Sequence, residues 1–204
     1  MSTQPKTLLT PAEYLAIERV AEFKSEFYRG EMFAMAGASR RHNQIVANIV
    51  GEFRERFKNG PCQIYPSDLR VRITPTGLYT YPDATIVCGE NEFEDDQLDT
   101  LLNPTVVFEV LSDTTESYDR GTKVSHYRRL PSVQEYVLIA QNRASVECYV
   151  RQATGGWLLH EATTLEEHVR FDSVDVDVPM SEIYRNVEFD PADASPSGST
   201  SSPT

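Results

Sequence analysis

The chain has 204 residues, a formal net charge of −12, and a composition that is 40% hydrophobic and 25% charged. These values are ordinary for a soluble globular protein, and no apolar run approaches the roughly 20 residues that a membrane helix needs. We expect one domain over residues 1–189 and a disordered tail over 190–204, because the tail is rich in Ser, Pro and Thr. The N-terminus shows no signal-peptide pattern, so we expect a cytoplasmic protein.

The negative net charge, taken alone, speaks against a nucleic-acid partner, because phosphate binding needs positive surface. The distribution of charge weakens this objection. Acidic residues concentrate in segments 90–99 and 161–177, which leaves room for a locally basic cleft elsewhere. The basic residues gather at Arg40, Arg41, Arg54, Arg56, Lys58, Arg70, Arg72, Arg120, Lys123, Arg128 and Arg129.

The first half of the chain predicts a helix, a hairpin and a second helix. Thr10, Pro11 and Glu13 form the start signal of a helix that runs to about Phe23. Arg29-Gly30 separates two short strands, which is typical of a hairpin. Apolar residues that recur every four positions then predict a helix from about residue 40 to residue 59.

The second half is rich in strands. A helix over Ser117–Arg129 and a short closing helix over 181–184 interrupt them. This order favours an α/β or α+β fold with a mixed central sheet flanked by helices. The predicted strands are Cys62–Tyr65, Leu69–Thr74, Ala84–Cys88, Thr105–Leu111, Glu135–Ala140, Ser145–Arg151, Trp157–Glu161 and Val169–Val178.

The three cysteines, Cys62, Cys88 and Cys148, are widely spaced and odd in number. No pair has the spacing of a zinc site. We expect all three to be ordinary small apolar residues rather than part of a disulfide framework.

Glu109 is the one carboxylate inside the strand predicted over Thr105–Leu111. Side chains alternate along a strand, so Glu109 shares its face with Val107 and Leu111. A carboxylate in such an apolar setting must be neutral, paired, or bound to a cation, because desolvation otherwise costs several kcal/mol.

Asp83 and Lys123 are the expected partners of Glu109. Asp83 follows Tyr81-Pro82 at the mouth of the preceding strand, from which its side chain can converge with Glu109. Two convergent carboxylates with open positions suit Mg²⁺ or Mn²⁺. Lys123 lies in the helix after the Glu109 strand, on a predicted face with Arg120 and Tyr127.

The segment NPTVVFEVLSDTTESYDRGTKVSHYRRLPSVQEYVLI, preceded by YPD, resembles the Uma-type family of restriction endonucleases in the PD-(D/E)XK nuclease superfamily. SEFYRGEMFAMAGAS and RHNQIVANI also match its pattern, and the resemblance covers roughly residues 9–188. It implies a restriction-endonuclease-like core, a magnesium- or manganese-dependent endonuclease, and hydrolysis of phosphodiester bonds in DNA.

The resemblance also assigns residues. Asp83 and Glu109 would be the metal ligands, and Glu26 would be a third ligand or a base. The superfamily pattern expects a lysine where this chain has Leu111, but related families place that lysine on the following helix, where Lys123 lies.

Each of these residues has a structural alternative. Glu109 would also be satisfied by an ion pair with Arg70 or Arg72. Asp83 could simply cap a turn, since Pro-Asp is common there. Lys123 could be a solvated helix residue.

For Glu26 the alternative is a cross-strand pair with Lys24 or Arg29. Arg120 is also a candidate substrate-binding residue. The other candidates have alternatives: His42 as a surface or helix-capping residue, Arg70 as a surface strand residue, and Tyr127 as core.

Two rival functions remain open. One is a catalytically silent module that binds DNA or a protein partner on the same fold. The other is a hydrolase that uses two carboxylates on a different substrate, such as a glycoside. Nuclease analogy further suggests a homodimer, because two cuts in a duplex suit a two-fold pair.

Overall fold

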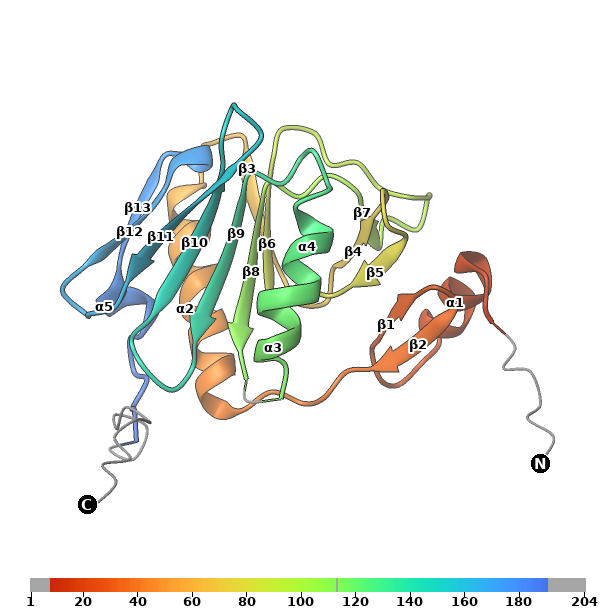
Figure 1. Ribbon diagram of the computed structural model, residues 1–204, viewed down its shortest axis with the longest axis horizontal. Helices are drawn as coiled ribbons and strands as arrows, with labels where there is room; N and C mark the ends of the chain where they lie inside the picture. Colours follow the sequence, from red (N-terminus) through yellow and green to blue (C-terminus); the bar gives the residue numbers. More distant parts are fainter. Residues whose placement is uncertain (1–7, 113, 191–204) are drawn as a thin grey trace, which may run out of the picture.

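A six-stranded mixed sheet in the order β11-β10-β9-β8-β6-β3 forms the centre of the fold (Figure 1). The computed structural model describes residues 8–112 and 114–190, so the predicted disordered tail lies almost wholly outside the described residues. The single-domain boundaries stay a prediction. The strands are β3 (Cys62–Pro66), β6 (Ala84–Cys88), β8 (Val106–Leu111), β9 (Glu135–Ala140), β10 (Val146–Arg151) and β11 (Trp157–Ala162).

Strands β8 and β9 are the parallel pair at the middle of this sheet, and their neighbours pair antiparallel. A parallel pair needs a crossover connection, usually a helix. Here the crossover is α3 (Glu116–Tyr118), a π-helical turn η1 (Asp119–Lys123) and α4 (Val124–Tyr127), which run on from one another. The helix predicted over residues 117–129 is confirmed.

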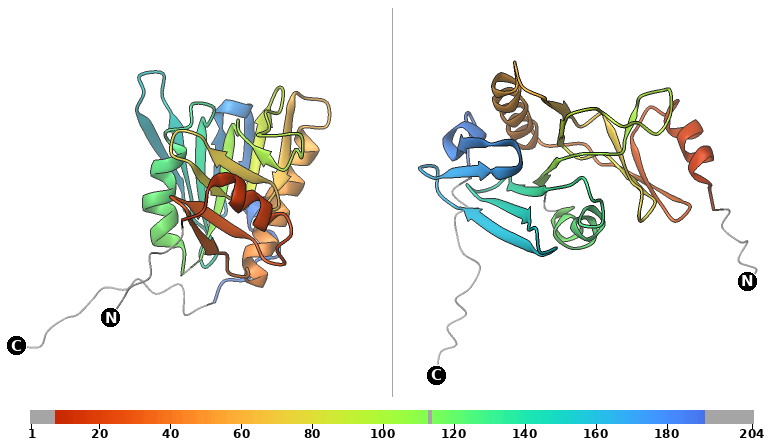
Figure 2. Two further views of the ribbon diagram at one scale, coloured as in Figure 1. Left: turned by 90° about the vertical axis from the view of Figure 1, so that its right-hand side faces the viewer. Right: turned by 90° about the horizontal axis from the view of Figure 1, so that it is seen from above.

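Helix α2 (Arg40–Arg56) covers the opposite face of the sheet from α3 and α4, as the view from above shows (Figure 2). Ser39 caps it by accepting the His42 N–H. Its apolar stripe packs against the sheet, with the Phe53 ring 5.4 Å from that of Phe108. The predicted mixed sheet flanked by helices is confirmed.

The strand predicted over 169–178 is wrong in detail. The segment is a hairpin of β12 (His168–Phe171) and β13 (Val176–Pro179). The 3₁₀ turn η2 (Asp172–Val174) and a left-handed Asp175 (φ 54°) reverse the chain between them. Helix α5 (Met180–Ile183) follows and packs on α2.

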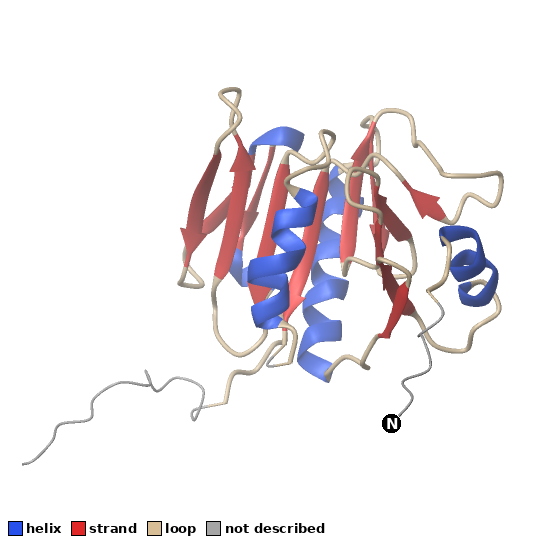
Figure 3. Cartoon of the chain, turned by 45° about the vertical axis from the view of Figure 1, so that its right-hand side comes forward, coloured by secondary structure: helices blue, strands red, loops and turns tan. Residues whose placement is uncertain are grey.

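A second sheet, ordered β2-β1-β5-β4-β7, lies beside the first (Figure 3). Its hairpin β1–β2 turns at Arg29-Gly30 as predicted, with positive φ at both residues. Helix α1 (Pro11–Glu18) has the predicted capping box. Strands β5 and β7 were not predicted because they are only three and two residues long. The strands are β1 (Ser25–Tyr28), β2 (Glu31–Ala34), β4 (Arg70–Ile73), β5 (Leu78–Thr80) and β7 (Thr100–Leu101).

Two hydrophobic clusters pack on the two faces of the central sheet. One joins α2, β12, β13 and α5 to the sheet. The other joins the second sheet and α4 to the opposite face, through residues such as Val71, Leu78, Val107 and Tyr127. No helix within 8–112 or 114–190 is long and apolar enough to cross a bilayer.

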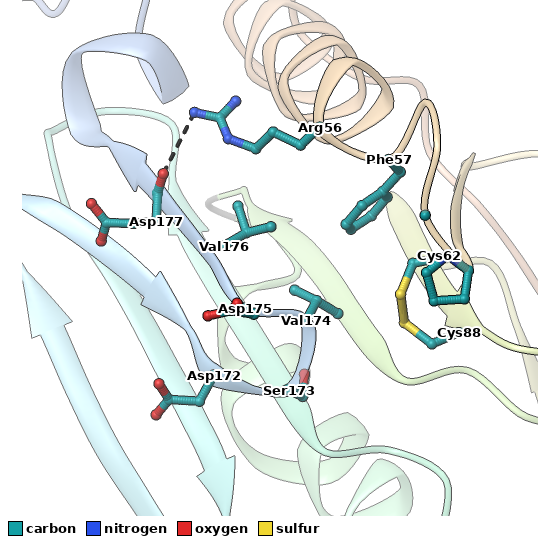
Figure 4. Close-up of a pocket in the computed structure, with 12 residues that line it drawn as sticks. Arg56, Phe57, Cys62, Cys88, Asp172, Ser173, Val174, Asp175, Val176 and Asp177 are labelled. Carbon is teal, nitrogen blue, oxygen red and sulfur yellow. Dashed lines mark hydrogen bonds between the residues drawn. A yellow bond between two sulfur atoms is a disulfide. The ribbon is translucent and has the colours of Figure 1, made fainter.

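The expectation that all three cysteines are unpaired is wrong. Cys62 and Cys88 face each other across the antiparallel pair β3–β6 and form a disulfide. The bond borders a pocket between the end of α2 and the β12–β13 hairpin (Figure 4). The two cysteines are 26 residues apart, so the sequence alone did not predict the disulfide. The pairing of β3 with β6 is what brings them together. Cys148 is free and buried.

Thiol titration in denaturant tests the disulfide. We expect one reactive thiol per chain before reduction and three after it. Closure of a loop of this size stabilises by about 3 kcal/mol, so reduction should lower the Tm by roughly 6–12 °C. A C62S/C88S variant should not respond to reductant. Three reactive thiols without reductant would contradict the bond.

Candidate active site

Glu109 points from the centre of β8 toward the crossover helix. Val106, Phe108 and Val110 belong to the cluster on the α2 face, whereas Val107 and Leu111 belong to the cluster on the other face. Alternation therefore directs Glu109 toward the second face, as predicted. The residue is only 4% exposed.

Lys123 supplies the positive charge that meets Glu109. Its Nζ lies 2.8 Å from Glu109 Oε1, 3.3 Å from Glu26 Oε1 and 3.7 Å from Asp119 Oδ1. Lys123 is 4% exposed, so the alternative of a solvated helix lysine is wrong. Neither Arg70 nor Arg72 pairs with Glu109; they pair with Asp99 and Glu94.

The π-helical turn η1 determines which side chains accompany Lys123. Asp119 and Lys123 are both buried, and they form an i,i+4 ion pair within the turn. Arg120 instead forms an ion pair with Glu147 on β10 at 2.6 Å. The prediction that Arg120 lies beside Lys123 is therefore wrong, and Asp119 is the residue of this turn that lies there. Single π turns inside helices frequently mark functional sites.

Glu26 comes from the second sheet. The Thr80 hydroxyl of β5 donates to its Oε1, and the Tyr118 hydroxyl of α3 donates to its Oε2 at 3.1 Å. It therefore does not form the alternative pair with Lys24 or Arg29, because its carboxylate faces the crossover helix. Glu26 thus joins the second sheet to the site.

Asp83 directly precedes β6 and is held by two other elements. Its Oδ2 accepts the Val110 N–H of β8 at 2.7 Å. Its Oδ1 lies 2.8 Å from His42 Nε2, which projects from the first turn of α2. The carboxylate therefore bridges β8 and α2 rather than capping its own turn, and His42 has a role beyond the helix start.

We call Glu26, Asp83, Glu109 and Asp119, together with Lys123, the carboxylate cluster. Burial raises the pKa of Glu109; Lys123 opposes this, while Asp119 and Asp83 add to it, and the pKa stands well above its ordinary value. Burial also raises the pKa of Asp119. Burial alone would lower the pKa of Lys123, but attraction by Glu109 and Glu26 outweighs it, so the pKa is raised.

The cluster therefore holds more acidic groups than cationic partners. The buried Oε1 of Glu109 has the Lys123 ammonium 2.8 Å away as its partner, so this oxygen already faces a cation. As the side chains stand, no three acidic, His or Cys residues among those described are arranged around one metal position. Mg²⁺ binds through one or two carboxylates plus waters, so Asp83 and Glu109 fit it.

Two predicted substrate-binding residues lie in the core. Arg70 is 3% exposed, and its guanidinium donates to Tyr81 and Thr100, so it is not on the predicted surface strand. Tyr127 is fully buried, with its ring 5.3 Å from that of Tyr136. Of the two, Tyr127 lies beside the carboxylate cluster, since Glu109, Lys123 and Glu26 all act on its pKa.

A family model described as "Uma2: Putative restriction endonuclease" matches residues 11–180. The chain belongs to the Uma2 family. The matched range contains every member of the carboxylate cluster. The family assignment therefore confirms the resemblance drawn from the sequence.

Two relatives of this chain come from Synechocystis sp. (strain PCC 6803). The uncharacterized protein slr1290 is 32% identical over 187 residues, covering 91% of this chain and 96% of its own. The uncharacterized protein sll1609 is 35% identical over 164 residues, covering 80% and 93%. A crystal structure from Anabaena variabilis, described as "a putative nuclease belonging to DUF820", has a TM-score of 0.71 at 16% identity and covers 86% of this chain and 97% of its own. That likeness shows a shared fold.

The sequence did not predict three members or neighbours of the carboxylate cluster: Asp119, Thr80 and Tyr118. Asp119 had a signal, because it precedes Lys123 by four residues, the spacing of a helical ion pair. Thr80 and Tyr118 had none, since they meet Glu26 across 54 and 92 positions of sequence.

The thermal stability of the metal-free Glu109→Gln variant, measured against pH, tests whether the pKa of Glu109 is raised. Since the folded-state pKa of Glu109 is raised above its ordinary 4.5, its contribution to stability is complete below that pH and is lost as pH rises toward the folded value. Wild type should therefore lose stability as the pH rises, whereas the variant has no carboxyl group at this position to ionise. The difference in Tm, variant minus wild type, should increase by a few degrees between about pH 5 and about pH 8. An exposed control, Glu161→Gln, should show no such trend. A difference that is constant with pH would contradict the raised pKa.

Proposed function

We propose that this protein is a cytoplasmic, Mg²⁺- or Mn²⁺-dependent endonuclease that hydrolyses phosphodiester bonds in DNA. Family membership supports a nuclease in general. The carboxylate cluster carries the finer proposal, because three buried acidic groups, Glu26, Glu109 and Asp119, surround one ammonium and the charge of Asp83 acts on the same Glu109. Such a buried excess of negative charge is costly for a fold and is typical of catalytic sites.

Asp83 and Glu109 would hold the cation. When bound, a divalent ion supplies Lewis-acid activation of water and stabilisation of charge on the phosphate. The Val110 N–H and His42 orient Asp83, since each contacts a different carboxylate oxygen. The position of Glu109 is set by β8, a fully buried strand.

Lys123 would stabilise negative charge that develops on the scissile phosphate, or orient the attacking water. Its ammonium stays protonated at neutral pH because Glu109, Glu26 and Asp119 raise its pKa. Glu26 holds Lys123 from the side of the second sheet and supports the metal or accepts a proton. Each member of the carboxylate cluster therefore has a proposed role.

The net charge of −12 does not oppose DNA binding at this site. The first turn of α2 carries Arg40, Arg41 and His42, and it contains no acidic residue. Arg40 has a side chain that is 83% exposed, with only a distant contact of 3.8 Å to Glu188. Arg41 pairs with Asp190, whereas the exposed Arg40 is in the same helical turn as His42, whose ring contacts Asp83, so Arg40 is the basic residue that would meet a phosphate backbone there.

Plasmid nicking tests the proposed activity. We expect purified wild-type protein to nick plasmid with Mg²⁺ or Mn²⁺ and to stop when EDTA is added. Asp83→Asn and Glu109→Gln should each lose at least about 100-fold in rate, because each removes a metal-binding charge. Glu161→Gln is the matched exposed control.

Intact plasmid at stoichiometric protein would overturn the enzyme assignment. Retained DNA binding in that experiment would favour the non-cleaving module. Activity that survives EDTA on a glycoside would favour the two-carboxylate hydrolase instead.

Lys123→Ala should separate catalysis from metal binding. Removal of the ammonium leaves the carboxylates free for the cation, so the Mn²⁺ affinity measured by calorimetry should hold or rise. The cleavage rate should nevertheless fall by about 100-fold or more, because the charge that stabilises the phosphate is lost. Lys123→Arg should restore part of the rate. A parallel fall in Mn²⁺ affinity would contradict this role.

We also propose a homodimer, since a two-fold pair of sites places one cut on each strand of a duplex. Light scattering on the full chain at micromolar concentration should give twice the mass of 23.0 kDa. A monomeric mass across that range would overturn this part of the proposal.

A further inference from the structure

Phe33 is a half-exposed aromatic residue on β2, with 48% of its surface accessible. Isolated exposed apolar residues are common and need no explanation by themselves. Within the described residues, however, Phe33 joins none of the hydrophobic clusters and no ring pair. What distinguishes it is its position in the hairpin.

The hairpin register places Phe33 directly opposite Glu26. Opposed residues in an antiparallel pair project from the same face, with Cβ atoms about 5 Å apart. The neighbouring pair, Phe27 and Met32, faces the other way and packs with Tyr14 under α1. Phe33 therefore shares the face from which Glu26 reaches Lys123.

Aromatic side chains line the rest of this face around Glu26. Tyr118 donates its hydroxyl to Glu26. Tyr28, two residues along β1, packs edge-on against His126 of α4 at 4.9 Å between ring centroids. Tyr118 and Tyr28 are thus engaged, whereas the Phe33 ring presents an open apolar surface beside the carboxylate cluster.

We infer that Phe33 is a stacking platform for an unpaired nucleobase of the substrate, an inference that rests on the proposed function. A flat, uncharged ring beside the Glu26 carboxylate cannot attract phosphate, but it can stack on any base, and such stacking is tolerant of sequence. Phe33 stands opposite Glu26 in the hairpin, and Glu26 Oε1 lies 3.3 Å from Lys123 Nζ, so a base stacked on Phe33 would belong to a nucleotide bound next to the carboxylate cluster. The site therefore prefers single-stranded or locally unpaired DNA to intact duplex.

Binding to a short single-stranded oligonucleotide that contains one 2-aminopurine tests this inference. Ca²⁺, which also takes oxygen ligands, replaces Mg²⁺, and a gel confirms that the strand stays intact. The variants are Phe33→Ala, Phe33→Leu and Phe33→Tyr. Leu159→Ala, a half-exposed apolar residue on the remote edge strand β11, is the control. Circular dichroism and Tm establish that each variant is folded.

We expect Phe33→Ala and Phe33→Leu to weaken single-strand binding by about 5- to 100-fold, the range that loss of base stacking produces. Quenching of 2-aminopurine should be lost in both and kept in Phe33→Tyr. Blunt duplex binding should change less, because its bases are already stacked.

Two results would overturn the inference in distinguishable ways. If wild type nicks plasmid but Phe33→Ala and Phe33→Leu bind single strands as tightly as wild type, Phe33 is not the platform and the proposed function stands. If wild type neither binds any oligonucleotide nor nicks plasmid, both fall. A variant that changes only the oligomeric mass, with unchanged DNA affinity, would also overturn the inference by assigning Phe33 to a contact between copies.

Discussion

The structure around the site depends on one buried ammonium, that of Lys123, among three carboxylates. Removing an ion from water costs several kcal/mol even after relaxation, and only well-placed partners offset that cost. Those partners must therefore be held rigidly. Glu109 is held by the central strand β8, Asp119 by the π turn that also carries Lys123, and Glu26 by a hairpin in another sheet.

This arrangement explains why the second sheet is part of the site. The N-terminal hairpin would otherwise be a peripheral addition to the central sheet. Its Glu26 accepts a hydrogen bond from Thr80 within the second sheet and another from Tyr118 of the crossover, which connects the hairpin to the helix that carries Lys123. Because Glu26 Oε1 lies 3.3 Å from Lys123 Nζ, the hairpin contributes directly to the surroundings of the ammonium.

The carboxylate cluster and the pocket near the disulfide are two separate places in the fold. Cys88 ends β6, whereas Asp83 directly precedes it, so the two sites lie at opposite ends of one strand, roughly 17 Å apart at about 3.3 Å per residue. The residues near the disulfide line a pocket, but the perturbed pKa values and the buried ion pairs are in the carboxylate cluster. Chemistry that acts on a phosphate requires the second set of properties.

Local pattern in the sequence determined most of the elements, the face on which Glu109 lies, and the family. Periodicity and capping act over a few residues, so they can be recognised without coordinates. The partners of each charge were decided only by tertiary structure: Asp83 with His42, Glu26 with Tyr118, Arg120 with Glu147, and Cys62 with Cys88. These pairs join residues 26 to 92 positions apart, and sheet order, which no local preference encodes, is what brings them together.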